Sequence, residues 1–348
     1  MIIFWVLFFT AFLATYYVMP HSIRKLKEAN YVVPDMYKVG KPVIPTNAGI
    51  IVLFVSYITI SLQPLFVRIL NFSGILENNS SDLSETNLAI LLVISIYALY
   101  GLVDDLVDIG QKLKLIIPIT FSFPLISVIN PDILEIPFYD NFDLRTSFFS
   151  NITYGDVFRI TILPVYVMVV ANLVNMHSGF NGLQSGLSII VLSALIFHSF
   201  FQGVLTNVLP LGAFFGAMVA FWFFNKYPSK VFEGNIGSLL FGAIIGCIIV
   251  VQEFWWFGFF ILIPHTVNFI LWIKWYKRIK YNPDSELNDK GEYMKFAKLE
   301  DDGTINPPNA LTLKWLPNYF FKIGESEATH YSYLFTIIFC LLGLLLFN

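Results

Sequence analysis

The chain has 348 residues, 56% of them hydrophobic and only 13% charged, and its mean hydropathy is +0.69. Soluble domains have roughly 45–50% apolar and about 25% charged residues, so this composition excludes a soluble globular protein. The 24 acidic and 21 basic residues give a net charge of −3, which offers no basic footprint for binding nucleic acid. Both cysteines fall in apolar runs and predict neither a disulfide framework nor a thiolate metal site.

Apolar stretches long enough to cross a bilayer recur along the whole chain. A hydrocarbon core about 30 Å thick requires roughly 17–25 apolar residues per helix. We therefore predict an all-α polytopic membrane protein with about ten transmembrane helices in one domain, residues 1–348. The first span lacks the features of a cleaved signal peptide and is expected in the mature chain. The expected spans are 2–20, 47–69, 87–103, 115–131, 157–174, 185–203, 207–224, 236–252, 254–273 and 331–347.

Lysines and arginines set the expected orientation. When the spans are threaded alternately, all of the 21 basic residues fall on one face except Arg68, Arg145 and Arg159. The positive-inside rule makes that face cytoplasmic and both termini non-cytoplasmic. The opposite loops contain the Asn-X-Ser/Thr acceptors of the chain, in agreement with the charge distribution. These acceptors are Asn71, Asn78, Asn79 and Asn151.

The expected spans carry no carboxylate at their centres, whereas transporters and channels usually place ionisable groups along their path. Besides tyrosines and cysteines, His198 and His265 are the titratable groups there, and we expect them to be packing residues. The chemistry is therefore expected at the cytoplasmic surface, where four short loops are rich in polar residues.

The first two of these loops combine lysines and acids at helix ends. Residues 35–49 place Lys38 at the mouth of the second span. Asp104 and Asp105 end the third span, and Asp108 follows one helical turn later, so three acids can converge on a divalent cation or a proton. Acids at a helix C-terminus are electrostatically unfavourable, which favours a functional role over a solvated helix end. Two lysines that suit phosphate follow, Lys112 and Lys114.

The other two loops supply carboxamides, glycines and charge. Residues 172–186 contain three asparagines and three glycines, which offer amide oxygens and a backbone that a ligand can approach closely. Residues 225–238 place Lys230, Glu233 and Asn235 just before a helix N-terminus, a typical anion site. Each loop alone is also explained as an ordinary polar connection. Together they suit a metal-bound polyanion that meets a lipid-borne partner.

The order and spelling of these loops resemble the polyprenyl-phosphate N-acetylhexosamine-1-phosphate transferase superfamily, glycosyltransferase family 4, over nearly the whole chain. The chain is more similar to the archaeal and eukaryotic UDP-GlcNAc:dolichyl-phosphate GlcNAc-1-phosphate transferases than to the bacterial MurNAc-pentapeptide enzyme. The similar segments are 101–118, with its Asp-Asp pair and its terminal Lys-Leu-Ile-Ile-Pro, and also 172–186, 227–232, 302–303 and 309–313.

The resemblance implies ten helices, both chain ends non-cytoplasmic, and an active site that faces the cytoplasm. The membrane would be the cell membrane in an archaeon and the ER membrane in a eukaryote. The implied reaction starts lipid-linked oligosaccharide assembly for protein N-glycosylation: dolichyl or another polyprenyl phosphate attacks the β-phosphorus of UDP-GlcNAc, giving GlcNAc-PP-dolichol and UMP. The implied cofactor is Mg²⁺, with Mn²⁺ as an alternative, and a homodimer is one assembly to consider.

The family's functional residues carry over by position. Asp104, Asp105 and Lys114 are expected to be catalytic, and Asn181 and Asn235 are expected to bind the metal. A phosphate nucleophile is already largely anionic near pH 7, so we expect the two aspartates mainly to organise charge. The expected substrate-binding residues are Lys38, Asn172, Asn175, Lys230 and Glu233.

At three places the chain departs from the family pattern. Asn235 stands where the family has a metal-binding Asp, and we expect Glu233 or the aspartate pair to supply the missing charge. Thr46 replaces a family Glu in the first cytoplasmic loop. A family Arg-His-Arg cluster after the ninth helix is missing, and the nearest basic residues are Lys277, Arg278 and Lys280.

Residues 274–329 are expected to form a small cytoplasmic insert before the last helix. Segments 293–299 and 311–315 alternate with period two and predict a short hairpin over the nucleotide site, the alternative being a loosely ordered loop. Two other functions stay open: a related transferase that uses another UDP-hexosamine or undecaprenyl phosphate, and a lipid or polyanion transporter. The lack of mid-span carboxylates favours the enzyme.

Overall fold

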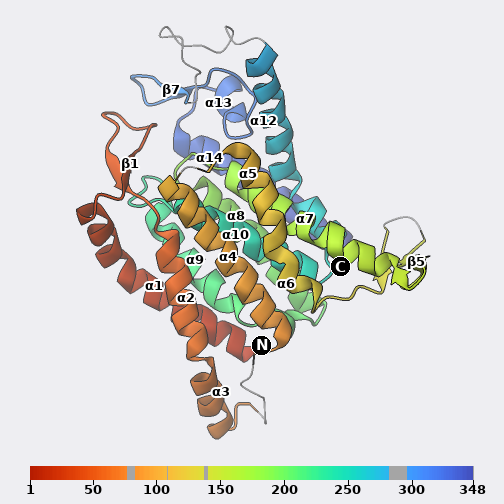
Figure 1. Ribbon diagram of the computed structural model, residues 1–348. Helices are drawn as coiled ribbons and strands as arrows, with labels where there is room; N and C mark the ends of the chain where they lie inside the picture. Colours follow the sequence, from red (N-terminus) through yellow and green to blue (C-terminus); the bar gives the residue numbers. More distant parts are fainter. Residues whose placement is uncertain (77–82, 108, 137–139, 282–295, 348) are drawn as a thin grey trace.

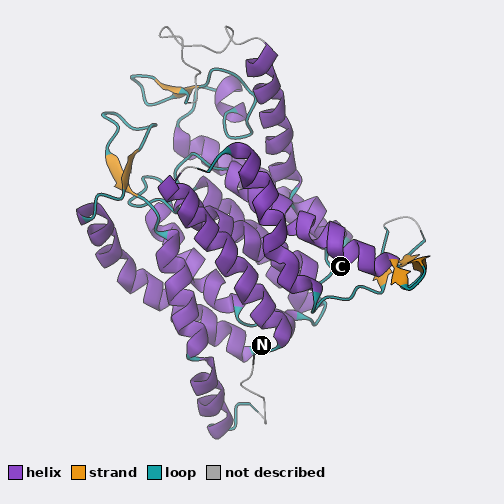
Figure 2. Ribbon diagram, viewed as in Figure 1, coloured by secondary structure: helices purple, strands orange, loops and turns teal. Residues whose placement is uncertain are grey.

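The chain forms a bundle of apolar helices with small antiparallel ribbons at its ends (Figures 1 and 2). The computed structural model describes residues 1–76, 83–107, 109–136, 140–281 and 296–347. In this part of the chain seven helical segments are long and apolar enough to cross a membrane, and the bent pair α11–α12 makes eight if it crosses as one. The seven are α1 (Ile2–Glu28), α2 (Gly49–Ser61) with α3 (Gln63–Phe72), α4 (Glu85–Val107), α7 (Tyr154–Met176), α8 (Leu183–Phe201), α10 (Gly234–Val251) and α14 (Glu325–Leu346).

Three of the expected spans are shorter or broken, so the count of ten stays a prediction. The segment expected at 115–131 consists of α5 (Gln111–Ile116), the 3₁₀ helix η1 (Ile117–Ser122) and α6 (Phe123–Ile126). Pro118 and Pro124 stand at the starts of the last two, because proline fits a first turn but interrupts a helix interior. The other two segments are α9 (Leu211–Asn225), preceded by the 3₁₀ helix η2 (Leu205–Val208), and α11 (Trp255–Ile261) with α12 (Ile263–Tyr281), bent by 61°.

Helix α10 is the centre of the bundle. Its side chains are buried continuously from Ile236 to Val250, and α2, α4, α7 and α8 pack around it. A helix that is apolar on every side is stable only when neighbours enclose it. The same neighbours therefore fix the position of its N-terminus, where the polar loops gather.

Helices α4 and α10 lie too close together for a side chain at Gly101. A Cβ there would lie 2.4 Å from the backbone oxygen of Asn235. We expect Gly101→Ala to displace the start of α10 and to lower the free energy of unfolding by about 1–3 kcal/mol, the usual cost of overpacking. Gly110→Ala is the matched control, because a Cβ at that position meets nothing within 4 Å. Thermal unfolding of both variants in detergent tests this, and equal melting temperatures would contradict it.

The polar connections lie at one end of the bundle. The hairpin of β1 (Val32–Pro34) and β2 (Val43–Pro45), which pairs Val33 with Ile44, lies there with the end of α4 and the insert, while the chain termini lie toward the other end (Figure 1). The sidedness relative to a membrane stays a prediction. The remaining ribbons are β3 (Ile133–Leu134) with β4 (Phe142–Asp143), β5 (Ser147–Phe149) with β6 (Ile152–Thr153), and β7 (Lys298–Leu299) with β8 (Ile305–Asn306).

The insert contains a hairpin, but its second strand is not the one predicted. Strand β7 pairs with β8, whereas residues 311–315 form bends and turns before α13 (Leu316–Phe320). Asp302 and Gly303 close the hairpin directly after β7: Thr304 N donates to Asp302 Oδ1 at 3.0 Å, and Gly303 has φ of +83°. The chain therefore turns back sooner than the alternation of residues suggested. Residues 293–295 of the predicted first strand lie outside the described residues.

Candidate active site

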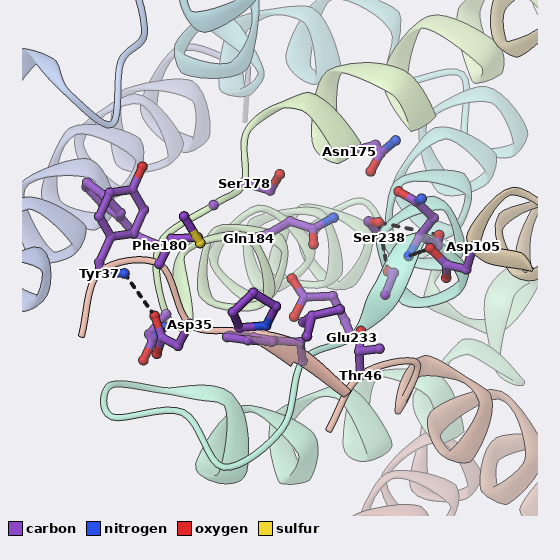
Figure 3. A pocket seen from close by; sticks show the side chains of 18 of the residues that line it. Asp35, Tyr37, Thr46, Asp105, Asn175, Ser178, Phe180, Gln184, Glu233 and Ser238 are labelled. Atoms are coloured by element: carbon purple, nitrogen blue, oxygen red, sulfur yellow. Dashed lines mark hydrogen bonds between the residues drawn. The ribbon is translucent and has the colours of Figure 1, made fainter. Parts of the chain in front are cut away.

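A cavity of about 300 Å³ lies at the polar end, between the first loop, the end of α4, the α7–α8 loop and the start of α10. Figure 3 shows Asp35 and Tyr37 at one end of it, Asp105 at the other, and Glu233 between them. The cavity thus brings together residues from distant segments of the chain. Five of the expected site residues line it: Asp105, Asn175, Asn181, Glu233 and Asn235. Its oxygen-bearing lining side chains are Asp35, Tyr37, Thr46, Asp105, Asn175, Ser178, Asn181, Gln184, Glu233, Asn235 and Ser238.

Asp105 holds the beginning of α10. Its Oδ1 accepts a hydrogen bond from the backbone N of Asn235 at 3.1 Å, and its Oδ2 accepts one from Ile236 N at 3.3 Å. The first N–H groups of a helix have no partners within the helix, so this carboxylate satisfies two of them and complements the helix dipole. Gly234 makes the approach feasible: its φ is +70°, and a Cβ there would lie 2.8 Å from Asp105 Oδ2.

The buried Asp104 forms an ion pair with the partly exposed Lys114. The distance from Lys114 Nζ to Asp104 Oδ1 is 2.9 Å, and Asp104 is only 6% exposed. The same Oδ1 accepts from Ile109 N, while Oδ2 accepts from Asn235 Nδ2 at 3.0 Å. These bonds offset the cost of burying the carboxylate. The structure thus brings Lys114 to Asp104, while the catalytic role expected for Asp104, Asp105 and Lys114 stays a prediction; Asp108 lies outside the described residues.

Asn235 bridges the two aspartates. Its backbone N donates to Asp105 and its side-chain amide donates to Asp104. An aspartate at this position would place a third carboxylate against Asp104, where the carboxamide instead donates a hydrogen bond. The carboxamide is therefore accommodated beside both carboxylates, and its role in binding the metal stays a prediction.

Glu233 extends into the middle of the cavity (Figure 3). Its Oε2 accepts a hydrogen bond from Asn225 Nδ2 at 3.0 Å. Burial raises the pKa of Glu233 to about 7, against the weaker opposing effect of its hydrogen bonds. The side chain is thus a carboxylate whose ionised form a bound cation would stabilise.

Asn181 joins three segments at the other end of the cavity. Its Nδ2 donates to Asp35 Oδ2 at 3.1 Å, and its Oδ1 accepts from Ser229 N at 2.8 Å. Its backbone N donates to Glu325 Oε1 at 2.5 Å. The carboxamide is 3% exposed. In this structure it is a connecting residue, and its role as a metal ligand stays a prediction.

Lys38 neutralises the acids beside Asn181. Its Nζ forms an ion pair with Glu325 and lies 3.5 Å from Asp35 Oδ2, and it stands over the ring of Tyr227. Both acids are buried. Sequence reasoning missed them: Asp35 has no distinguishing pattern around it, and Glu325 is 287 positions from Lys38, so only the fold brings the pair together. Lys38 supports the cavity from outside its lining.

Only some of the other residues expected to bind substrate line the cavity. Asn175 lines the cavity, as does Thr46. Asn172 donates to Met168 O within α7, and Lys230 is exposed; neither belongs to the lining. Their expected contacts with substrate stay predictions. The basic residues proposed to replace the Arg-His-Arg cluster are exposed near the end of α12 and also lie outside the lining: Lys277, Arg278 and Lys280.

The donor set suits a hard divalent cation that is also held by substrate. Among the described residues no three His, Cys, Asp or Glu side chains converge into a metal site by themselves. The cavity does present the carboxylates of Asp105 and Glu233 and the carboxamide of Asn235. Mg²⁺ typically takes one or two carboxylates and completes its shell with water and substrate phosphates. The residues therefore fit the implied ion.

Comparison with known proteins identifies the family of the chain. The family model described as glycosyl transferase family 4 matches residues 87–253, which include both aspartates, Glu233 and Asn235. A putative UDP-N-acetylglucosamine–dolichyl-phosphate N-acetylglucosaminephosphotransferase of Saccharolobus solfataricus is 30% identical over 312 residues, 88% of this chain and 84% of that protein.

Two further relatives show the breadth of the similarity. The UDP-N-acetylglucosamine–dolichyl-phosphate N-acetylglucosaminephosphotransferase of Dictyostelium discoideum is 25% identical over 75% of this chain and 69% of its own length. The phospho-N-acetylmuramoyl-pentapeptide-transferase of Borreliella afzelii is 28% identical over 68% of this chain and 70% of its own length. Together with the archaeal similarity over most of both chains, these matches show that the chain belongs to glycosyl transferase family 4.

Proposed function

We propose that this protein transfers GlcNAc-1-phosphate from UDP-GlcNAc to dolichyl or another polyprenyl phosphate. An oxygen of the acceptor phosphate attacks the β-phosphorus of UDP-GlcNAc, the bond from that phosphorus to the bridging oxygen breaks, and UMP leaves. The observation that carries the proposal is the convergence of Asp105, Glu233 and Asn235 in one polar cavity of a membrane bundle. The names of the archaeal and Dictyostelium relatives support the sugar and the lipid.

Positioning and charge neutralisation are the main contributions to phosphoryl transfer. Asp105 fixes the start of α10 and with it Glu233 and Asn235, while Asp104 orients Lys114. The ammonium of Lys114 is a phosphate contact in this proposal. An anionic phosphate needs no strong general base, so both aspartates act through the charges that they organise.

Mg²⁺ is the cofactor that we propose, with Mn²⁺ able to replace it. Asp105, Glu233 and Asn235 are the residues that would hold the ion, which would neutralise charge on the diphosphate. The basic loops at the cavity's end support a cytoplasmic active site, in the cell membrane or the ER membrane. The product would then serve as the first intermediate of lipid-linked oligosaccharide assembly for N-glycosylation.

The test is UMP release by the purified protein. UDP-GlcNAc, UDP-GalNAc and UDP-MurNAc-pentapeptide are each supplied with dolichyl phosphate or undecaprenyl phosphate, with and without Mg²⁺. We expect UMP only when a polyprenyl phosphate and Mg²⁺ are present, and most with UDP-GlcNAc. Higher activity with the pentapeptide donor would favour the function named for the Borreliella relative. No UMP from any donor would contradict a transferase.

The raised pKa of Glu233 leads to a pH-dependent prediction. The carboxyl is mostly protonated at pH about 6 and mostly ionised at pH about 8, so cation affinity should rise across this interval. We expect Glu233→Gln to raise the Mg²⁺ concentration for half-maximal activity about tenfold and to remove its pH dependence. Activity measured over Mg²⁺ and pH tests this.

Glu253→Gln is the control, because Glu253 lies between α10 and α11 and lines a different cavity from the one that holds Glu233. An unchanged Mg²⁺ requirement in Glu233→Gln would remove Glu233 from the metal site while leaving the transferase assignment in place.

A further inference from the structure

The insert touches the α7–α8 loop from behind the cavity. Lys314 Nζ donates a hydrogen bond to the backbone oxygen of Ser178 at 3.1 Å. Ser178 and Gly179 belong to the lining of the cavity, and Lys314 does not. The lysine therefore contacts the outer side of a wall whose inner side faces the site.

The contact between Lys314 and this turn is tight. Gly179 has φ of +109°, and a Cβ there would lie 2.3 Å from Lys314 Nζ. The ammonium also stands near the rings of Phe180 and Trp315, and Trp315 is only 1% exposed. Glycine thus serves both the backbone conformation and the close approach of the lysine.

A second contact links the insert to the start of the same loop. Asn268 on α12 accepts from Leu313 N at 2.9 Å and donates to Met176 O, the last residue of α7, at 3.2 Å. Leu313 and Lys314 are consecutive, so the insert is linked to both sides of His177: directly to Ser178 through Lys314, and through Asn268 to Met176. The insert is therefore registered against the wall at two points.

The ammonium of Lys314 is buried and is not solvated by water. Burial lowers the pKa of Lys314 to about 8, and the carboxylate of Glu325 opposes this effect. The neighbouring ring of His177 stacks edge-on with His265 at 4.8 Å, and burial, with His265 and Lys314 nearby, keeps the pKa of His177 well below its usual value. Burying an ammonium is costly unless it is hydrogen-bonded. The bond from Lys314 to Ser178 O offsets part of this cost.

We propose that Lys314 is a positioning residue for the nucleotide-sugar donor, acting through the turn at 178–180. This inference rests on the proposed transferase function. Phe180 lies at the Asp35 end of the cavity, away from Asp105 (Figure 3). In this proposal the donor's diphosphate lies at the end with Asp105, Glu233 and Asn235, and the rest of the donor extends toward the turn that Lys314 holds.

The decisive variants are Lys314→Met, which keeps the length of the side chain without its charge, and Lys314→Arg, which restores a charged donor. We expect Lys314→Met to raise the KM for UDP-GlcNAc about tenfold, as the loss of one charged hydrogen bond would, with kcat within about twofold. Lys314→Arg should recover most of the effect. Lys298→Met is the control, because Lys298 is an exposed insert lysine whose side chain is 74% accessible.

Hydrogen exchange supplies a readout that does not need activity. In the full-length protein in detergent, amides of residues 179–183 should exchange about tenfold faster in Lys314→Met than in wild type, and not in Lys298→Met. If wild type releases no UMP but this difference persists, the proposed function fails and the positioning contact stands.

Unchanged exchange together with an unchanged KM would overturn the proposal. So would equal losses in Lys314→Met and Lys314→Arg, because a charge-dependent hold predicts rescue by arginine. Should Lys314→Met fail to fold, Lys314→Gln provides the uncharged comparison, and the same two measurements decide.

Discussion

Asp104→Asn is expected to reduce kcat by about 100-fold, an effect of the size seen when one organising electrostatic group is removed. The substitution keeps the shape of the side chain but removes the charge that holds Lys114 at 2.9 Å, and it sets an amide against Asn235 Nδ2. Ile109 N and Asn235 Nδ2 donate to the same buried carboxylate, so an asparagine leaves one donor without an acceptor, and we also expect a loss of about 1–3 kcal/mol in unfolding free energy.

A double-mutant cycle separates the ion pair from general damage. Lys114→Met alone should lower kcat similarly, and the double variant should be little worse than either single one, because both remove one unit. Asp143→Asn is the matched control, since Asp143 pairs with Arg145 on the exposed surface. Additive losses in kcat would contradict a coupled role for Asp104 and Lys114.

Asp105→Asn is expected to have a comparable effect for a different reason. An asparagine accepts through only one of its two terminal atoms, so one of the N–H groups of Asn235 and Ile236 loses its partner. The first turn of α10 should loosen, which displaces Glu233 and Asn235 and lowers kcat by about 100-fold. The free energy of unfolding should fall by about 1–2 kcal/mol, as for other lost helix caps.

The matched control for this variant is Asp156→Asn. Asp156 accepts from Thr153 N at the start of α7, so it stabilises a helix N-terminus in a similar way but does not line the cavity. We expect a similar loss of stability and an unchanged kcat. An unchanged kcat in Asp105→Asn would contradict its role in placing Glu233 and Asn235. Thermal unfolding and UMP release, measured on the same preparations, give both quantities.

The helical bundle was predictable because apolar length and lysine placement are strong signals in a membrane protein. The breaks were also visible in principle, since Pro118 and Pro124 mark the interruptions of the segment expected at 115–131. The second strand of the insert was misplaced because alternation was weighed above Asp302 and Gly303, which close the turn earlier.

The polar motifs of the candidate site could be recognised in the sequence, but the contacts between them could not be predicted. Asp105 is recognisable as a polar residue at a helix end, yet its contact with Asn235 spans 130 positions. Glu325 and Lys314 lie in segments with no local pattern of a site, and only packing of the insert and α14 brings them to the α7–α8 loop. Local sequence specifies local conformation; such long-range polar contacts follow from the tertiary fold.

The enclosure of α10 has a consequence for how the family can diversify. The cavity stands on the N-terminus of the enclosed helix α10 and the end of α4, whereas its other walls are the β1–β2 ribbon, the α7–α8 turn and the insert. Substitutions in the ribbon, the turn or the insert can change the shape of the cavity for a different sugar or lipid without disturbing the packing of α10. Substrate specificity can therefore change through these segments while the packing of the helical bundle is kept.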